Sequence, residues 1–192
     1  YYADDVMMYV APAPVAPSLP ITFQDTVTID HAITPFGGNN SWMVVDPTDP
    51  NNTVLETNKG TGAQIWAGTT IGGNGLASAV PFSATATKMT VRVWSPDAGT
   101  PIRLKVEDAA NGTISVETED TTTLAGQWET LTFDFSNQVV GNPLNLANTY
   151  DKVSIFFDFG TGGAGKTYYA DDVMMYVAPA PVAPSLPITF QD

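Results

Sequence analysis

The chain has 192 residues, of which 43% are hydrophobic, and its 20 acidic and 7 basic side chains leave a net charge of −13. That apolar content is too high for a disordered tail, and the acidic charge argues against nucleic acid or anionic membrane surfaces as partners, because both bind basic patches. With no cysteine, the chain has no disulfide framework and no thiol chemistry. We also expect no membrane insertion, because no apolar run is long enough to span a bilayer.

The first 25 residues, YYADDVMMYVAPAPVAPSLPITFQD, recur without change as residues 168–192. Self-similarity at a fixed period is the signature of a repeat array. The offset between the two copies is 167 residues, which is the size of one ordinary domain. The sequence therefore predicts one full period of a tandem array, with an overlap into the next period.

The Pro/Ala-rich part of the duplicated segment predicts where modules join. Residues 11–20 and 178–187 contain four prolines each and no charge, a composition typical of a semi-rigid linker. Residues 1–10 are then the last strand of a preceding repeat, 21–177 form one complete module, and 188–192 begin the first strand of a following repeat. We expect contact between modules through apolar residues of these overhangs: Val6, Met8, Val10, Ile188 and Phe190.

From residue 21 onward, short runs of alternating or β-branched residues follow one another with turn residues between them. In chain order they are residues 21–30, 41–46, 53–58, 63–67, 77–83, 88–95, 102–108, 113–119, 127–135, 152–159 and 168–177. A period of two over many short runs is typical of half-buried strands in antiparallel sheets. The sequence therefore predicts an all-β fold, a jelly-roll-type β-sandwich of two antiparallel sheets, repeated with a period of 167 residues.

Several motifs carry a family resemblance that covers nearly the whole module. In chain order they are Trp66-Ala67-Gly68, MTVRVWSPDAG from 89, LKVE from 104, VET from 116, GQWETLTFDF from 126 and YYADDV from 168. This order resembles carbohydrate-binding-module-type β-jelly-roll domains, which are found in tandem in secreted bacterial glycan-active proteins. The resemblance implies a β-sandwich, usually a structural calcium ion, and in many members glycan binding.

The resemblance nominates Asp171 or Asp172, together with Asp25, as ligands of that calcium. Adjacent carboxylates repel each other, and a hard cation can hold several carboxylate and carbonyl oxygens. The alternative is a pair of solvated aspartates at a strand edge.

Exposed aromatic residues are the candidates for glycan binding, because sugars bind against flat aromatic faces with polar groups beside them. Trp66, Trp94, Arg92 and Tyr150 are the residues that we expect at such a site. Trp94 follows the polar register of its strand, beside Arg92, which favours exposure. The alternative for each aromatic residue is packing in the core of the sandwich.

No pattern in the sequence indicates catalysis. The only histidine, His31, has no Ser and Asp partner pattern and no second histidine at metal-ligand spacing. The glycine-rich run 160–167 joins two predicted strands, so it lacks the helix N-terminus that a phosphate-binding loop needs. We therefore expect no enzyme.

Exact repetition favours a structural role, as the repeat unit of an extracellular multi-module fibre or adhesin whose modules join through the linker and terminal strands. The partners would then be neighbouring copies, at the cell surface or outside the cell. The alternative is a carbohydrate-binding module whose repetition gives multivalent attachment to a polysaccharide.

Overall fold

The computed structural model describes residues 12–180, and these form a sandwich of two antiparallel β-sheets without a helix. Within this described part, no helix is long and apolar enough to cross a membrane. The strands are β1 (Thr34–Phe36), β2 (Asn39–Asp46), β3 (Asp49–Lys59), β4 (Gly68–Ile71), β5 (Lys88–Ser95), β6 (Pro101–Asp108), β7 (Asn111–Thr121), β8 (Gln127–Asp134), β9 (Val140–Gly141), β10 (Lys152–Phe157) and β11 (Lys166–Met175).

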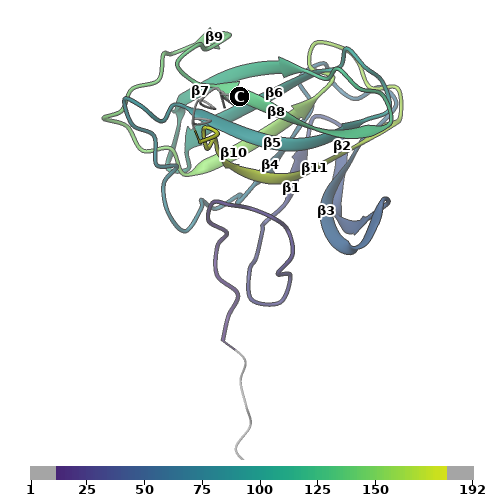
Figure 1. Ribbon diagram of the computed structural model, residues 1–192, viewed down its shortest axis with the longest axis horizontal. Coiled ribbons are helices and arrows are strands. Elements are labelled where there is room, and N and C mark those ends of the chain that lie inside the picture. Colours follow the sequence, from purple (N-terminus) through teal and green to yellow (C-terminus); the bar gives the residue numbers. More distant parts are fainter. Residues whose placement is uncertain (1–11, 181–192) are drawn as a thin grey trace, which may run out of the picture.

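The two sheets differ in the number and order of their strands. The six-stranded sheet has the order β1-β4-β10-β6-β7-β9, and the five-stranded sheet has the order β2-β3-β11-β5-β8. Hairpins join β2 to β3 and β6 to β7, whereas β11, the last strand among the described residues, lies between β3 and β5. In Figure 1 the strands form one body. The hairpin of β2 and β3 extends from its lower right side, and the purple opening segment lies below it.

The alternation predicted from the sequence is confirmed on β5. On β5, Met89, Val91 and Val93 are fully buried, while their neighbours along the strand point outward. The buried positions of both sheets meet in one hydrophobic core, because each strand turns every second side chain inward. The sequence prediction of an all-β sandwich is therefore correct.

Three predicted strands are wrong. Residues 63–67 form turns ahead of β4, and 77–83 form a loop that contains Pro81 and contributes the buried Val80 to the core. Residues 21–30 make only isolated bridges, because Phe23 has a φ of 57° and breaks the extended backbone. These runs thus belong to loops, some of whose side chains, such as Val80, are buried without pairing in a sheet.

The opening segment closes against the last strand. Ile21 donates its backbone N–H to the carbonyl of Val173 at 2.9 Å and accepts one from Val173 at 3.0 Å. Pro17 is buried, and its carbonyl accepts the N–H of Ala77 at 2.8 Å. Part of the predicted linker 11–20 thus lies against the module, while the domain boundaries themselves stay predictions.

A buried lysine ties the two sheets together at one end. Lys59, at the end of β3, is 1% exposed, and its Nζ donates to the carbonyls of Phe157 at 3.0 Å and Asp158 at 2.8 Å. Burial lowers the pKa of Lys59, which the nearby Asp158 partly offsets. The ammonium group satisfies two carbonyls where β10 leaves its sheet, and buried carbonyls without partners destabilise the fold.

We expect Lys59→Met to lower the free energy of unfolding by about 1–3 kcal/mol, because the side chain keeps its volume but leaves both carbonyls without a donor. Chemical denaturation measures this loss. Lys166→Met is the matched control, since that lysine pairs only with the exposed Asp97 at 2.7 Å. Equal denaturation midpoints for the two variants would contradict the role given to Lys59.

Candidate functional site

Polar side chains line the outer face of the six-stranded sheet, where every second residue of a strand points away from the core. The register places Ser154 of β10 between Thr70 of β4 and Lys105 of β6. Lys105 in turn lies opposite Glu117 of β7. One row of hydroxyl, ammonium and carboxylate groups therefore crosses four adjacent strands.

An aromatic wall stands beside this row. Trp66, in the turn before β4, is 50% exposed and stacks on Phe36 with ring centroids 6.2 Å apart. Phe156 meets Phe36 edge-on at 5.5 Å, and Phe159 meets Phe156 edge-on at 5.7 Å. Gly68 makes room for the wall, since a Cβ there would lie 2.6 Å from both Phe36 and Phe156.

The wall and the polar row enclose an open hollow of about 330 Å³, which we call the aromatic groove. It is lined by Phe36, Trp66, Thr70, Lys105, Glu107, Glu117, Ser154, Phe156 and Phe159. Ligand sites in proteins typically combine apolar and aromatic walls with a few placed polar groups. The groove can therefore hold a ring that has apolar faces and hydroxyl groups at its rim.

Glu107, which lines the groove, accepts hydrogen bonds from the ammonium groups of two lysines. Lys105 lies 2.6 Å from its carboxylate, and Lys152 pairs with the other oxygen. Burial by itself would raise the pKa of Glu107, but the hydrogen bonds from the two lysines lower it below its usual value. Glu107 thus stays ionised, the opposite of the protonated carboxyl that a glycosidase uses as general acid.

Arg103 organises the neighbouring strip. Its guanidinium pairs with Glu117 and with Glu119 at 3.1 Å each, and it lies 3.6 Å over the ring of Phe159. A guanidinium held on two carboxylates and an aromatic face has little freedom left. These side chains are therefore already oriented before a ligand binds. The positive charge of the guanidinium is compensated by the negative charge of the carboxylates.

The outer face of the five-stranded sheet carries a second set of aromatic residues. Strand register sets Trp42, Glu56, Tyr169, Trp94 and Trp128 in one row across the five strands. Trp94 and Tyr169 pack edge-on with centroids 5.4 Å apart. Trp128 also contacts Tyr169, with ring centroids 6.3 Å apart, whereas Trp42 at the edge of the row is 47% exposed.

Arg92 lies beside this row and joins two buried carboxylates. It contacts Asp46 at 3.2 Å and Asp171 at 3.1 Å, and its guanidinium sits 4.0 Å over the ring of Trp128. The side chains of Asp46 and Asp171 are 0% and 3% exposed. Arg92 thus compensates two carboxylates that would be costly to bury unpaired.

Asp46 has the most perturbed carboxyl group of this cluster. Its burial would raise the pKa, but donors from Thr48, Asn52 and Trp128 outweigh burial and lower the pKa of Asp46 to about 2. For Asp171, burial dominates and raises the pKa in spite of a hydrogen bond from Asn52. The pKa values of the two carboxyl groups are therefore shifted in opposite directions, and on acidification Asp171 is protonated before Asp46.

The structure separates the four predicted glycan-binding residues. Trp66 lines the aromatic groove, whereas Trp94 and Arg92 lie on the opposite sheet. Tyr150 is 3% exposed and packs against Phe82 in the core, so its ring offers no face to a sugar. The residues are thus distributed over three places, and only Trp66 belongs to the groove.

Sequence reasoning missed the remaining aromatic residues of the groove. Phe156 and Phe159 belong to a stretch that is apolar on nearly both faces, which indicates either core or a covered surface. That pattern was the available signal, since a two-sided apolar strand in a sandwich has one face outside the core. Phe36 follows a proline in a three-residue strand and carried no comparable signal.

The predicted calcium ligands have other partners in the described part of the chain. Asp25 is exposed and caps a turn, accepting the backbone N–H groups of Val27 and Thr28 at 3.0 and 2.8 Å. Asp171 is paired with Arg92, and Asp172 has a φ of 49° at an irregularity of β11. No group of three or more His, Asp or Glu side chains placed to hold a metal ion lies among residues 12–180, and calcium stays a prediction.

The predicted contacts between modules, Val6, Met8, Val10, Ile188 and Phe190, lie outside the described residues.

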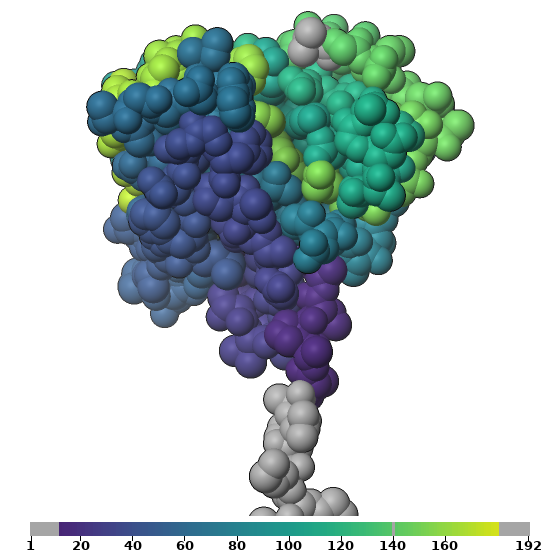
Figure 2. Space-filling model, turned by 180° about the vertical axis from the view of Figure 1, so that it is seen from behind, coloured from purple at the N-terminus to yellow at the C-terminus, as the bar shows by residue number. Residues whose placement is uncertain are grey.

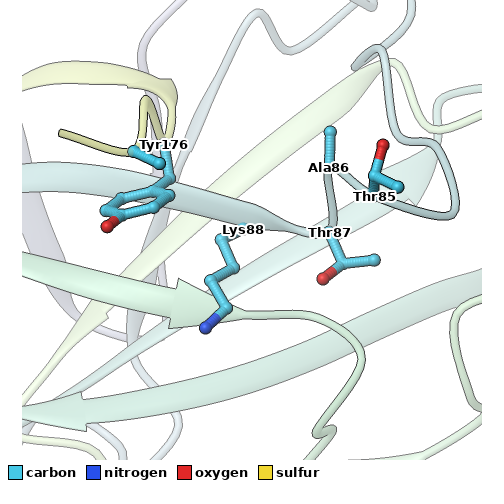
Figure 3. A pocket seen from close by; sticks show the side chains of 6 residues that line it. Thr85, Ala86, Thr87, Lys88 and Tyr176 are labelled. Carbon is cyan, nitrogen blue, oxygen red and sulfur yellow. The ribbon is translucent and has the colours of Figure 1, made fainter. Parts of the chain in front are cut away.

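A smaller hollow of about 230 Å³ lies where β11 ends. Figure 3 shows the ring of Tyr176 beside the side chain of Lys88, with Thr85, Ala86 and Thr87 forming the facing turn. Lys88 is already paired with a carboxylate, that of Asp134, at 3.3 Å. With a single ring and a single, paired cation, this hollow is a weaker candidate than the aromatic groove.

Comparison with known proteins shows the fold. Neither protein-family models nor curated protein sequences match the chain. Among solved structures, a family 11 carbohydrate-binding module from Clostridium thermocellum, in complex with a β-1,3-1,4-mixed-linked tetrasaccharide, is 14% identical with a TM-score of 0.53, covering 81% of this chain and 94% of its own. A family 22 xylan-binding domain from Paenibacillus barcinonensis is 15% identical with a TM-score of 0.52, covering 89% of this chain and 100% of its own.

Enzymes match only through a part of their length. An exo-β-agarase is 12% identical with a TM-score of 0.59 and an α-L-arabinofuranosidase is 19% identical with a TM-score of 0.53, covering 83% and 82% of this chain. The chain spans about a quarter of the length of each, because 25% of either enzyme is covered. The chain therefore has the β-sandwich fold of carbohydrate-binding-module-type jelly rolls, as its sequence motifs predicted.

The buried Asp46 predicts a loss of stability in acid. Because the pKa of Asp46 is about 2 in the folded protein, below its usual 3.8, its ionised form stabilises the fold above pH 4 by about 2 kcal/mol. This contribution is lost as the pH falls from about 4 to about 2. Unfolding measured across this range should have a shallower pH slope in Asp46→Asn than in wild type. Parallel slopes would contradict the assignment.

Proposed function

We propose that the protein is a non-catalytic carbohydrate-binding module and that its aromatic groove binds a neutral polysaccharide. The observation that carries this proposal is Trp66, half exposed and stacked on Phe36, standing beside a row of fixed polar groups. Aromatic faces pack against the apolar face of a sugar ring, and the polar row meets its hydroxyl groups.

The charge of the groove favours a neutral glycan over an acidic one. Each cation at its floor is paired with a carboxylate, so no free positive charge remains there for uronate or sulfate groups. The net charge of −13 also repels polyanions. Mixed-linked β-glucan and xylan, named for the two modules of similar fold, are neutral or nearly so and are the first ligands to test.

The ion pairs also support binding without hydrolysis. A glycosidase needs one carboxyl group kept protonated and a second carboxylate at a defined separation. In the groove, Glu107 is held ionised by two lysines, and Arg103 occupies both Glu117 and Glu119. We accordingly place the protein outside the cell or at its surface, where polysaccharides are met.

A second role as a structural repeat unit is favoured by one observation, the exact recurrence of residues 1–25 as 168–192. We propose that such modules follow one another in a fibre or adhesin. The two roles are compatible, because repeated weak sites raise the effective concentration of a glycan.

Trp66→Ala should weaken binding to the glycan that the wild type retains by about tenfold or more, because it removes the exposed ring of the wall. Affinity electrophoresis in mixed-linked β-glucan and in xylan, followed by calorimetry, measures the change. Trp42→Ala is the matched control, since Trp42 is 47% exposed on the opposite sheet. If Trp42→Ala rather than Trp66→Ala lost affinity, or if neither polysaccharide retarded the wild type, the groove assignment would be wrong.

Gly68→Ala tests the groove without removing a ring. A Cβ at this position lies 2.6 Å from Phe36 and from Phe156, so the two rings must move apart. We expect a loss of glycan affinity of about the same size as for Trp66→Ala, with the fold retained in circular dichroism. Unchanged affinity in a folded Gly68→Ala protein would show that the spacing of the wall has no part in binding.

A further inference from the structure

A further hollow, of about 240 Å³, lies on the β9 side of the six-stranded sheet, and we call it the amide hollow. Three asparagines and three residues with hydroxyl groups line it: Asn142, Asn145, Asn148, Thr113, Ser115 and Tyr150. None of its lining residues is charged at neutral pH. Figure 1 shows β9 beside β7 at one end of the body, and in Figure 2 the light green segment that follows β9 lies beside the teal-green residues of β7.

Strand β7 links the amide hollow to the aromatic groove. Thr113, Ser115 and Glu117 are alternate residues of this strand, and alternate side chains of a strand share one face of the sheet. Val116 between them is buried in the core, so the shared face is the outer one. Glu117 lines the aromatic groove, and Ser115, about 7 Å further along the strand, lines the amide hollow.

Glu107 forms the border between the two hollows. It lines the aromatic groove, and in the register it lies opposite Ser115 of β7 on one side and Lys152 of β10 on the other. These three residues make a second polar row across the sheet, next to the row that crosses the groove. The ion pair between Lys152 and Glu107 holds the border in place. The polar surface therefore continues from the aromatic groove to the amide hollow.

Hydrogen bonds fix the loop that forms one wall of the amide hollow. The N–H of Asn145 donates to the hydroxyl of Tyr150 at 3.1 Å, and Oδ1 of Asn145 accepts the N–H of Ala147 at 3.0 Å. The N–H of Asn148 donates to the carbonyl of Asn145 at 3.0 Å. Tyr150 itself is buried against Phe82 in the core. The loop is therefore preorganised, which lowers the entropy that binding costs.

The chemistry of the amide hollow fits the hydroxyl groups of a neutral sugar. An asparagine side chain has two N–H donors and a carbonyl acceptor, and a serine or threonine hydroxyl both donates and accepts. Sugar hydroxyl groups also donate and accept, so both partners can be satisfied. A carboxylate, sulfate or phosphate group would find no cation among the lining residues. Because the ring of Tyr150 is buried, this hollow offers hydrogen bonds where the aromatic groove offers stacking.

We propose that the amide hollow is a second subsite for the polysaccharide that the aromatic groove binds, an inference that rests on the proposed function. One part of the polysaccharide stacks on Trp66. Further sugar units pass Glu107 and place their hydroxyl groups against Ser115 and Asn148. Affinity therefore depends on the length of the glycan, because only a chain long enough to leave the groove reaches the amide hollow.

Ser115→Ala and Asn148→Ala, each alone, should weaken the binding of long oligosaccharides by about threefold, because each variant removes a hydrogen-bonding group. The shortest oligosaccharide that binds should be unaffected, since it occupies the aromatic groove alone. Calorimetry measures this with a ladder of oligosaccharides from mixed-linked β-glucan or xylan, whichever the wild type retains, and the wild type should bind longer members more tightly. Asn51→Ala is the matched control, an exposed asparagine on β3 of the other sheet. Circular dichroism verifies the fold of each variant.

Two results would overturn the proposal and leave the aromatic groove intact. If Ser115→Ala and Asn148→Ala bound every oligosaccharide as the wild type does while Trp66→Ala lost affinity, the amide hollow would have no part in binding. If the two variants weakened the shortest oligosaccharide as much as the longest, the hollow would not be an additional subsite. A wild type that bound neither ladder would overturn the proposed function itself, and this inference with it.

Discussion

The sandwich depends on a central strand, β11, that comes last among the strands of residues 12–180. β3 and β5 meet only through β11, and β11 also receives Ile21 of the opening segment. Tyr168 of this strand stacks on Phe157 of the other sheet at 5.0 Å. The five-stranded sheet is therefore incomplete until its final strand is in place, and the pairings that complete it are distant in sequence, which slows folding.

The aromatic groove is a product of the same alternation that builds the core. Once Val153 and Ile155 point inward from β10, Ser154 and Phe156 have to point outward. An apolar residue so placed is covered by neighbours, and here Phe36, Trp66 and Phe159 cover it while leaving Trp66 half exposed. The absence of a side chain at Gly68 determines how closely these rings approach. The groove thus arises because the outward-facing Phe156 packs against other aromatic side chains.

Strands with a clear period-two alternation were predicted correctly from the sequence. The strand predicted over residues 88–95 coincides with β5, because alternation over eight residues admits one register against the core. The strand predicted over residues 77–83 was wrong, because a loop packed against a sandwich also buries apolar side chains. For the site, Trp66 was one of several aromatic candidates in the sequence, and the structure places it at the aromatic groove. Trp94 and Tyr150 were predicted for the same site, but Trp94 lies on the other sheet and Tyr150 lies in the core. The residue pattern along one strand does not indicate which sheet that strand joins.

The sequence by itself determined the all-β class, the long strands, the absence of thiol chemistry and the duplicated segment, because composition, period-two alternation and identity are properties of the chain alone. Tertiary structure decided which outward-facing residues share a surface. It brought Phe36, Trp66 and Phe156 together and paired Asp171 with Arg92, since strand order in a sheet depends on contacts between segments far apart in sequence. It also placed β11, the last strand of the described residues, at the centre of its sheet.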